Sequence, residues 1–310
     1  MFNPDIFQLS PEVEAALAEK RPVVALESTV IAHGLPRPLN LETARRLEQI
    51  VSEEGATPAT IAIIEGKICV GLGGEQLEKI AMGGGHVHKI SRRDLPVAVA
   101  RGWDGATTVA ATIWIAERAG LKVFATGGIG GVHRGALPDV SADLPELART
   151  KMIVVCSGAK SVLDLPATRE WLETHGITVA GYGCDELPAF YSRQSGLPID
   201  VRVDAVEEIV ELDKARQALG TEGALLVVVP VPLAQEVSFG LLREVLADAI
   251  AEAEKQRIGG WELTPFLLSR MSEQSGGATL RANVALLENN ARVAAGIAVV
   301  LAPRLRDGKQ

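Results

Sequence analysis

Short apolar runs alternate with amphipathic segments along most of the chain. Residues 153–156 and 225–229 are continuous apolar runs, which is typical of strands buried on both faces of a parallel sheet. Residues 40–55 and 239–260 instead place apolar side chains three and four positions apart, as amphipathic helices do. Further strands are expected at 22–32, 59–64, 67–72, 122–126 and 177–183, and further helices from residue 11 and at 73–85, 95–102, 105–120, 143–150, 167–176, 205–219 and 279–302.

This alternation of strands and helices predicts an α/β protein. The expected architecture is a three-layer α/β/α arrangement with a central mixed, largely parallel sheet. The sequence shows neither an internal repeat nor a low-complexity linker, so one domain over residues 1–310 is expected. Ligands of open α/β sheets bind beyond the carboxyl ends of the strands, and the candidate chemistry is therefore sought there.

Composition narrows the class of protein. The chain has 310 residues and a net charge of −8, which disfavours a groove for nucleic acid. Its start lacks the pattern of a signal peptide, and no uninterrupted apolar run approaches the roughly 20 residues of a membrane span. Cys69, Cys156 and Cys184 are far apart and have no metal-ligand spacing, so buried free thiols are expected. We expect a cytoplasmic protein without nucleic-acid or membrane partners.

The first unusual strand end is "ALESTVIAHGLPRP". Glu27 lies inside an apolar run, where a carboxylate is costly unless it is paired or protonated. Glu27 is interpreted either as half of an ion pair at the rim of the sheet or as a general acid or base. His33 either joins it or is only a hydrogen-bonding residue of a loop rich in glycine and proline.

The second strand end is the glycine-rich stretch "FATGGIGGVHRG", followed by "DVSAD". Glycines after a strand let backbone N–H groups approach an anion, which indicates a phosphate or sugar phosphate rather than a dinucleotide. Asp139 and Asp143 bracket Ser141 just before an expected helix. These residues are either ordinary helix caps or oxygen ligands for a hard cation such as Mg²⁺ or Mn²⁺.

The third strand end is "IVVCSGAKSVLDL", in which one lysine follows a buried strand and Ser161 is expected to open a helix. Lys160 is either a solvated turn residue or a desolvated amine that attacks a carbonyl carbon and forms a Schiff base. Lys89, near histidines and arginines in "HVHKISRRD", is either an anchor for a phosphate or a surface charge.

Together these stretches carry a resemblance that covers residues 10–302. The chain resembles the pseudouridine-5′-phosphate glycosidase family, also called indigoidine synthase A-like proteins. The matching stretches are "ALESTVIAHGLPRP", "IEGKICVGL", "KISRRDLP", "GATTVAAT", "FATGGIGGVHRG", "DVSADL", "VVCSGAKSVLDL", "TPFLL" and "ANVALLENN".

The resemblance implies reversible cleavage of pseudouridine 5′-phosphate, with water, to uracil and ribose 5-phosphate in pseudouridine catabolism. It also implies one Mn²⁺ per subunit, with Mg²⁺ as an alternative, and a homotrimer. By position in these stretches, Lys160 is the imine-forming lysine, Glu27 the proton donor and Asp139 the metal ligand. The substrate-lining positions implied in the same way are Lys89, Val109, Ser141, Ala142 and Asp143, with His133 and Asn283 as further polar positions of the pocket.

The implied chemistry explains a lone lysine at the end of a buried strand. Pseudouridine joins ribose to uracil through carbon, which is a far worse leaving group than a heteroatom, so the usual route of a glycosidase carries a higher barrier. A lysine nitrogen on C1′ lets the C–C bond break in a retro-Mannich step, and covalent catalysis divides one difficult step into easier ones. Burial without an acidic partner favours the neutral amine that this attack needs.

Two other classes of function stay open at this point. One is a different enzyme on the same scaffold, such as a Schiff-base aldolase or lyase for sugar phosphates, or a hydrolase of N-nucleotides. The other is a binding or regulatory protein without turnover, which is disfavoured because Lys160, Glu27 and Asp139 are all present.

Overall fold

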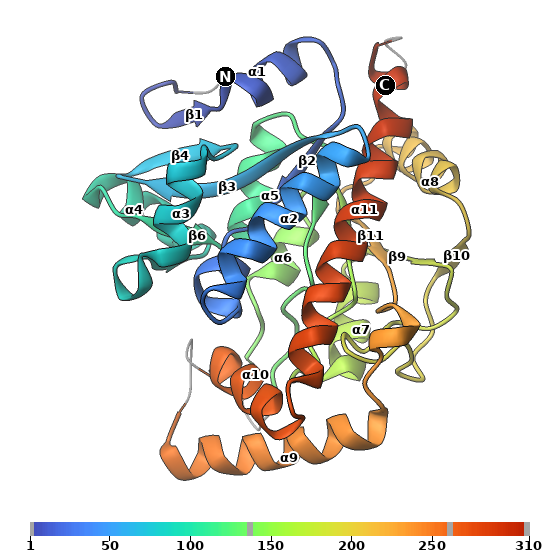
Figure 1. Ribbon diagram of the computed structural model, residues 1–310. Coiled ribbons are helices and arrows are strands. Elements are labelled where there is room, and N and C mark those ends of the chain that lie inside the picture. The colour runs from blue at the N-terminus through green and yellow to red at the C-terminus, as the bar shows by residue number, and fades with distance from the viewer. Residues whose placement is uncertain (1–2, 135–138, 259–262, 307–310) are drawn as a thin grey trace.

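The computed structural model describes residues 3–134, 139–258 and 263–306. Its centre is an 11-stranded sheet in the order β1-β4-β3-β2-β7-β8-β11-β9-β10, with β6 paired to β3 and β5 paired to β6 (Figure 1). The described pairs are parallel except β3 with β4 and β3 with β6. The strands are β1 Phe7–Leu9, β2 Val23–Leu26, β3 Thr57–Ile64, β4 Lys67–Val70, β5 His88–Ile90, β6 Gly105–Thr107, β7 Val123–Ala125, β8 Ile153–Cys156, β9 Thr178–Tyr182, β10 Val201–Val203 and β11 Leu225–Val228.

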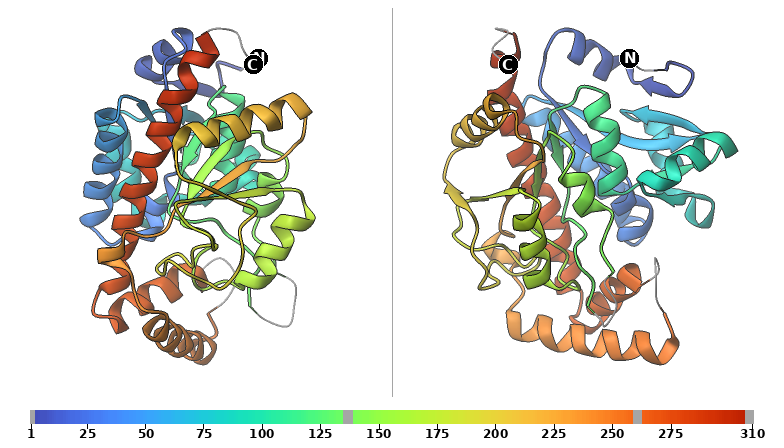
Figure 2. Two further views of the ribbon diagram at one scale, coloured as in Figure 1. Left: turned by 90° about the vertical axis from the view of Figure 1, so that its right-hand side faces the viewer. Right: turned by 180° about the vertical axis from the view of Figure 1, so that it is seen from behind.

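Helices cover both faces of this sheet and confirm the expected three-layer architecture. Helices α2 and α11 lie on the face seen in Figure 1, and α5, α6 and α7 lie behind it, as the view from the back in Figure 2 shows. The helices are α1 Pro11–Ala18, α2 Leu39–Glu53, α3 Gly74–Met82, α4 Leu95–Arg101, α5 Val109–Arg118, α6 Asp143–Leu147, α7 Leu165–Thr174, α8 Val206–Leu219, α9 Phe239–Gln256, α10 Leu263–Gln274 and α11 Ala278–Arg306.

Local sequence accounts for several of these elements. All four residues of β8 are buried between β7 and β11, which is why this strand reads as a continuous apolar run. Helix α1 begins where expected, because the Ser10 hydroxyl accepts a hydrogen bond from the Val13 amide at 3.3 Å. The turn between β3 and β4 places Glu65 and Gly66 at φ of 51° and 77°, the left-handed region in which glycine is favoured.

Three expected boundaries were wrong. The strand expected at 22–32 ends at Leu26, and the chain then turns through η1, a short π-helical segment at Val30–Gly34. The segment expected to be one helix at 105–120 consists of strand β6 followed by helix α5. The helix expected to open at Ser161 begins at Leu165, because Asp164 is the residue whose side chain caps it.

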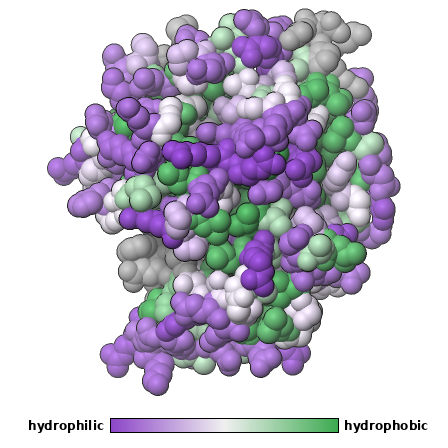
Figure 3. All heavy atoms as spheres, viewed as in Figure 1, coloured by the Kyte–Doolittle hydropathy of each residue, from purple (hydrophilic) through white to green (hydrophobic). Residues whose placement is uncertain are grey.

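The helical pair α9 and α10 lies beside the carboxyl-end side of the sheet, at the bottom of Figure 1. Helix α10 was not expected from the sequence. It packs on α9 and also contacts η1 and α11. The space-filling view in Figure 3 shows a largely hydrophilic face with apolar residues gathered between this pair and the body of the molecule.

Helix α11 is the one described helix that is long and apolar enough to span a membrane by length and composition. Half of the apolar window is buried inside the protein, and the helix packs along β2, β7, β8, α2 and α8. Asn290 in its middle is fully buried and bonded to the sheet. These contacts are those of a core helix of a globular protein.

Candidate active site

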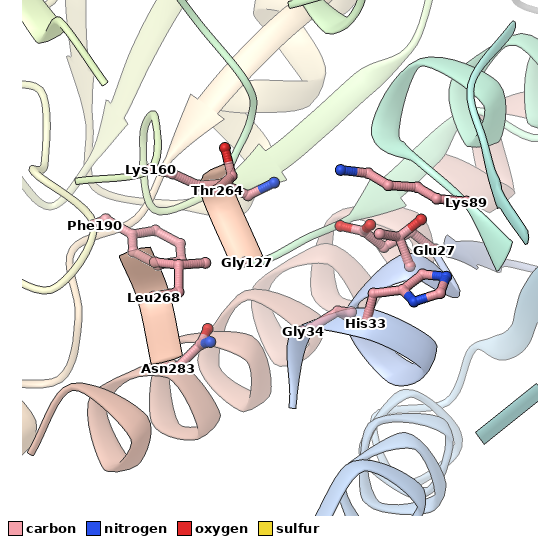
Figure 4. A pocket seen from close by; sticks show the side chains of 13 residues that line it. Glu27, His33, Gly34, Lys89, Gly127, Lys160, Phe190, Thr264, Leu268 and Asn283 are labelled. Atoms are coloured by element: carbon pink, nitrogen blue, oxygen red, sulfur yellow. The ribbon is translucent and has the colours of Figure 1, made fainter. Parts of the chain in front are cut away.

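The ends of three neighbouring parallel strands form the candidate active site. Strand β7 lies between β2 and β8, so the segments that follow these three strands meet at one edge of the sheet. A cavity of about 60 Å³ opens there (Figure 4). Its walls include Glu27, Lys89, Lys160, Phe190, Leu268 and Asn283.

Glu27 follows β2 directly and is 8% exposed. The Thr126 hydroxyl donates a hydrogen bond of 2.5 Å to its carboxyl group. Burial raises the pKa of Glu27, while the charge of Lys160 and the Thr126 bond act against this rise. Glu27 has no ion pair in the described part of the chain, so the interpretation as a rim salt bridge was wrong. The environment favours a protonated carboxyl group that is able to donate its proton.

Lys160 follows β8 and extends its amine into the cavity. It is half-buried, and its backbone N–H donates to the carbonyl of Ile129 at 3.1 Å. Within the described residues its amine has no hydrogen bond and no ion pair, which leaves it free to meet a ligand. Figure 4 shows this amine and that of Lys89 pointing toward each other across the cavity, next to the carboxyl group of Glu27.

Lys89 lies on β5 and supplies the second cation. Burial and the charge of Lys160 lower the pKa of Lys89, and the charges of Asp143 and Glu27 oppose that shift. Lys89 also lines an adjoining cavity together with Ser91, Arg93 and Thr108. A cation with hydroxyl groups and an arginine around it suits a phosphate.

The glycine-rich loop after β7 passes very close to its neighbours. A Cβ atom on Gly128 would lie 2.6 Å from the ring of Phe190, and one on Gly130 would collide with the Ser141 side chain. Asp143, 6% exposed, accepts hydrogen bonds from the amides of Gly130 at 2.7 Å and Ala110 at 2.9 Å. Both oxygens of this carboxylate therefore hold backbone segments, while the Ser141 hydroxyl accepts a hydrogen bond from the Asp143 amide at 3.2 Å.

The structure brings together four of the ten sequence-predicted site residues as cavity walls, Glu27, Lys89, Lys160 and Asn283. The other six do not line this cavity: Val109 and Asp143 are the first residues of α5 and α6, and His133, Asp139, Ser141 and Ala142 lie in the loop between β7 and α6. Val109 is buried at the start of α5, Ala142 is exposed, and the His133 amide donates to the Asp139 carbonyl at 2.8 Å. Asp143 is close enough to influence the pKa values of Glu27 and Lys89.

Asp139 is the residue expected to hold a metal. Its carboxylate is exposed and has no hydrogen bond or ion pair within the described residues. No group of three His, Cys, Asp or Glu side chains in the described ranges forms a closed metal cluster. One free carboxylate fits a hydrated Mn²⁺ or Mg²⁺, which keeps several waters and takes oxygen ligands from the substrate.

Sequence reasoning missed several cavity residues. It also missed Thr126, which does not line the cavity but donates a hydrogen bond to Glu27 from the position just before the glycines of "FATGG". Thr264 and Leu268 of α10 lie in "TPFLL", one of the stretches that carry the resemblance, but were not assigned to the site, and Phe190 comes from a segment without a recognisable pattern. His33, considered as a loop residue, lines the cavity, and its Nε2 is buried without a partner in the described part of the chain.

The chain is similar to known proteins over nearly its whole length. Residues 12–300 match the family described as indigoidine synthase A like protein. A protein of Hahella chejuensis named pseudouridine-5′-phosphate glycosidase is 51% identical, with 94% of this chain and 96% of that protein covered. A protein of Solibacter usitatus with the same name is 53% identical, with 95% and 99% covered.

Two solved structures have the same fold, each with a TM-score of 0.89. One is an indigoidine synthase A-like protein of Thermotoga maritima, 39% identical, with 97% of this chain and 98% of that chain covered. The other is the prealnumycin C-glycosynthase AlnA in complex with ribulose 5-phosphate, 40% identical, with 97% and 99% covered. The chain therefore belongs to the indigoidine synthase A-like family of enzymes.

Proposed function

We propose that this enzyme cleaves the C–C glycosidic bond of pseudouridine 5′-phosphate to give uracil and ribose 5-phosphate, reversibly and through an imine on Lys160. The observation that carries the proposal is the free amine of Lys160 facing the buried carboxyl group of Glu27 in one cavity. The proposal is also supported by relatives with 51% and 53% sequence identity, which are named pseudouridine-5′-phosphate glycosidase.

The first covalent step uses Lys160 as the nucleophile. Its neutral amine adds to C1′ of the ribose while the bond between C1′ and the ring oxygen breaks, and Glu27 gives its proton to that oxygen. Glu27 then takes a proton from the new ammonium group. The short bond from Thr126 holds the carboxyl group in place for both transfers.

The second step breaks the C–C bond. Glu27 returns its proton to C5 of the uracil ring. The nitrogen lone pair then forms a C1′=N double bond as the electron pair of the C1′–C5 bond passes into the protonated ring, restores its C5=C6 double bond and releases uracil. Water then hydrolyses the iminium ion, so that ribose 5-phosphate leaves and the Lys160 amine is restored.

Two further groups support binding. Lys89 and its neighbouring hydroxyl groups would hold the 5′-phosphate, and this binding orients C1′ toward Lys160. Asp139 would hold a divalent cation, Mn²⁺ in this proposal, which when bound supplies positive charge and fixed positions for oxygen atoms of the substrate. The proposal also includes a homotrimer in the cytoplasm, by analogy with the family.

Borohydride trapping tests the proposal. With ribose 5-phosphate present, reduction should leave a covalent ribityl phosphate group on Lys160, visible in the intact mass and in a peptide map. Lys160→Ala should remain folded, form no adduct and lose turnover. An active wild-type enzyme that yields no adduct under these conditions would exclude the imine mechanism.

A substrate panel separates the alternatives. Equal concentrations of pseudouridine 5′-phosphate and uridine 5′-phosphate are compared by release of uracil. The proposed enzyme prefers the C-nucleotide, whereas an N-nucleotide hydrolase on this scaffold prefers uridine 5′-phosphate.

A further inference from the structure

A fully buried amide lies behind the candidate site, on the core helix α11. Asn290 is 0% exposed. Its Nδ2 donates to the carbonyl oxygens of Thr126 at 2.8 Å and Gly127 at 3.4 Å, and it also lies 3.1 Å from the hydroxyl group of Ser157. A buried amide is unfavourable unless it is hydrogen-bonded, and this one is bonded at both the donor and the acceptor end.

The partners of Asn290 are the ends of two strands. Thr126 and Gly127 follow β7, and Ser157 follows β8. The two ends are also joined directly, because the Ser157 amide donates to the Gly127 carbonyl at 2.9 Å. One side chain on α11 therefore connects the two segments at the point where regular strand pairing stops.

The first segment leads to the proton donor. The Thr126 residue that offers its carbonyl to Asn290 also donates its hydroxyl to Glu27. A shift of the Thr126 backbone would move that hydroxyl group and with it the carboxyl group of Glu27. The other charges that face Glu27 are Lys160, Asp143 and Lys89, and the hydrogen bonds of Asn290 in the described residues run to none of them.

The second segment leads to the nucleophile. Ser157 precedes Lys160 by three residues in the turn after β8. This turn is bonded to the loop after β7, because the Lys160 amide donates to the Ile129 carbonyl. The Ser157 carbonyl accepts from the amide of Phe190, whose ring also lines the cavity. The position of the Lys160 backbone thus depends on the same junction that Asn290 holds.

We propose that Asn290 is a positioning residue that sets the distance and orientation of Lys160 relative to Glu27 by joining the ends of β7 and β8. It does not line the cavity, so it acts through Thr126 and Ser157 rather than on the substrate. The inference rests on the proposed function, in which these two residues act on one substrate.

The test compares Asn290→Leu, which keeps the volume and removes the hydrogen bonds, with Asn289→Leu. Asn289 is the adjacent residue of the same helix, is half-buried and has no hydrogen bond in the described ranges. The measurement is the rate of borohydride-trapped adduct formation with ribose 5-phosphate over a range of sugar concentrations and pH. Circular dichroism and a thermal unfolding curve establish that each variant is folded.

Asn290→Leu should lower the adduct rate at saturating ribose 5-phosphate by about 10- to 100-fold, because a displacement of about 1 Å between reacting groups costs that much. The half-saturating concentration should change by less than about threefold, and Asn289→Leu should behave as the wild type. The alkaline limb of the pH profile should move to higher pH, since the Thr126 bond that lowers the pKa of Glu27 is weakened. Thr126→Val should produce the same shift, and the effects of the two substitutions should not add in the double variant.

A folded Asn290→Leu with the wild-type adduct rate and pH profile would overturn the inference. If this variant does not fold, Ser157→Ala decides, because it removes one arm of the junction and leaves the bond to Thr126. It should slow adduct formation about tenfold without moving the pH profile, and an unchanged rate would again overturn the inference. A wild-type enzyme that forms no adduct contradicts the proposed function instead.

Discussion

In the proposed mechanism Glu27 has to meet two requirements that a single carboxyl group seldom combines. It must hold a proton at neutral pH, which burial favours, and it must give that proton up within reach of two lysines. The Thr126 bond and the charge of Lys160 keep the ionised form accessible. Both the protonated and the ionised form of the Glu27 carboxyl group are therefore accessible, as a proton shuttle requires.

Glu27→Gln should lower kcat by about 10²–10⁴-fold, because the amide cannot transfer the proton.

The same change should raise stability at pH 8 by a few degrees in Tm. The pKa of Glu27 is raised on folding, so its stabilising contribution is complete below the unfolded pKa and is lost as pH rises through the folded pKa. The gain in Tm should therefore disappear near pH 4, and calorimetry at the two pH values measures it. A gain of equal size at both values would contradict this account.

Lys89 makes a separate prediction for binding. Lys89→Met should raise KM for pseudouridine 5′-phosphate by about 10- to 100-fold, the loss expected for one charge-assisted hydrogen bond. Because the pKa of Lys89 is lowered, the wild-type KM should itself rise as pH increases through that lowered pKa, before ordinary lysines lose their charge. Lys79→Met is the matched control, since Lys79 is paired with Asp104 away from the cavity. An equal rise in KM for both variants would remove Lys89 from the phosphate site.

At the scale of elements, the loop after β7 sets the width of the cavity. Gly128→Ala places a methyl group 2.6 Å from the Phe190 ring and 2.9 Å from the Gly158 carbonyl, so one of these walls must move. We expect kcat/KM to fall at least about 100-fold while the sheet remains folded. Gly74→Ala is the control, because nothing lies within 4 Å of its added Cβ and Gly74 lines neither this cavity nor the adjoining one. Steady-state kinetics on both variants tests this prediction. Wild-type kcat/KM in Gly128→Ala would show that the loop has room for the methyl group and does not limit the cavity.

The same scale shows what the sequence alone predicts. The buried strands and the amphipathic helices α2 and α9 could be predicted because each buries its apolar residues in a regular period. Strand β6 and helix α10 could not, because β6 is three residues long and α10 takes its stability from packing on α9. The predicted end of β2 was wrong because the strand stops before Ser28. The Ser28 hydroxyl instead donates to the carbonyl of Ile61, 33 residues further along the chain.

The candidate site follows a similar division. Lys160 and Glu27 could be found from polar residues at the ends of apolar strands, and the family resemblance gave them roles. Thr126 and Asn290 could not be assigned, because their importance lies in hydrogen bonds between segments far apart in the chain, 164 residues in the case of Asn290 to Thr126. Hydrogen bonds between residues so far apart in the sequence form only when the sheet is assembled, and the local sequence pattern does not indicate them.

For the whole molecule, the proposed metal and trimer make one joint prediction. Removal of divalent cations with a chelator should lower turnover, and Mn²⁺ should restore it. Asp139→Asn should raise the Mn²⁺ concentration needed for half-maximal activity by about tenfold or more, because it removes the one free carboxylate at that position. Sedimentation of the same samples should give three times the chain mass of 32.8 kDa with and without metal. Turnover that is indifferent to the chelator would contradict the metal assignment.

Helix α11 has a consequence for how the protein is made. It is the last described element of the chain, yet it contributes Asn283 to the cavity wall and Asn290 to the back of the sheet. During translation Lys160 is synthesised long before α11, the helix that closes its surroundings. A nascent chain that does not yet contain α11 would leave the apolar face of the sheet open to chaperones and proteases, so the same helix completes both the cover of the sheet and the wall of the cavity.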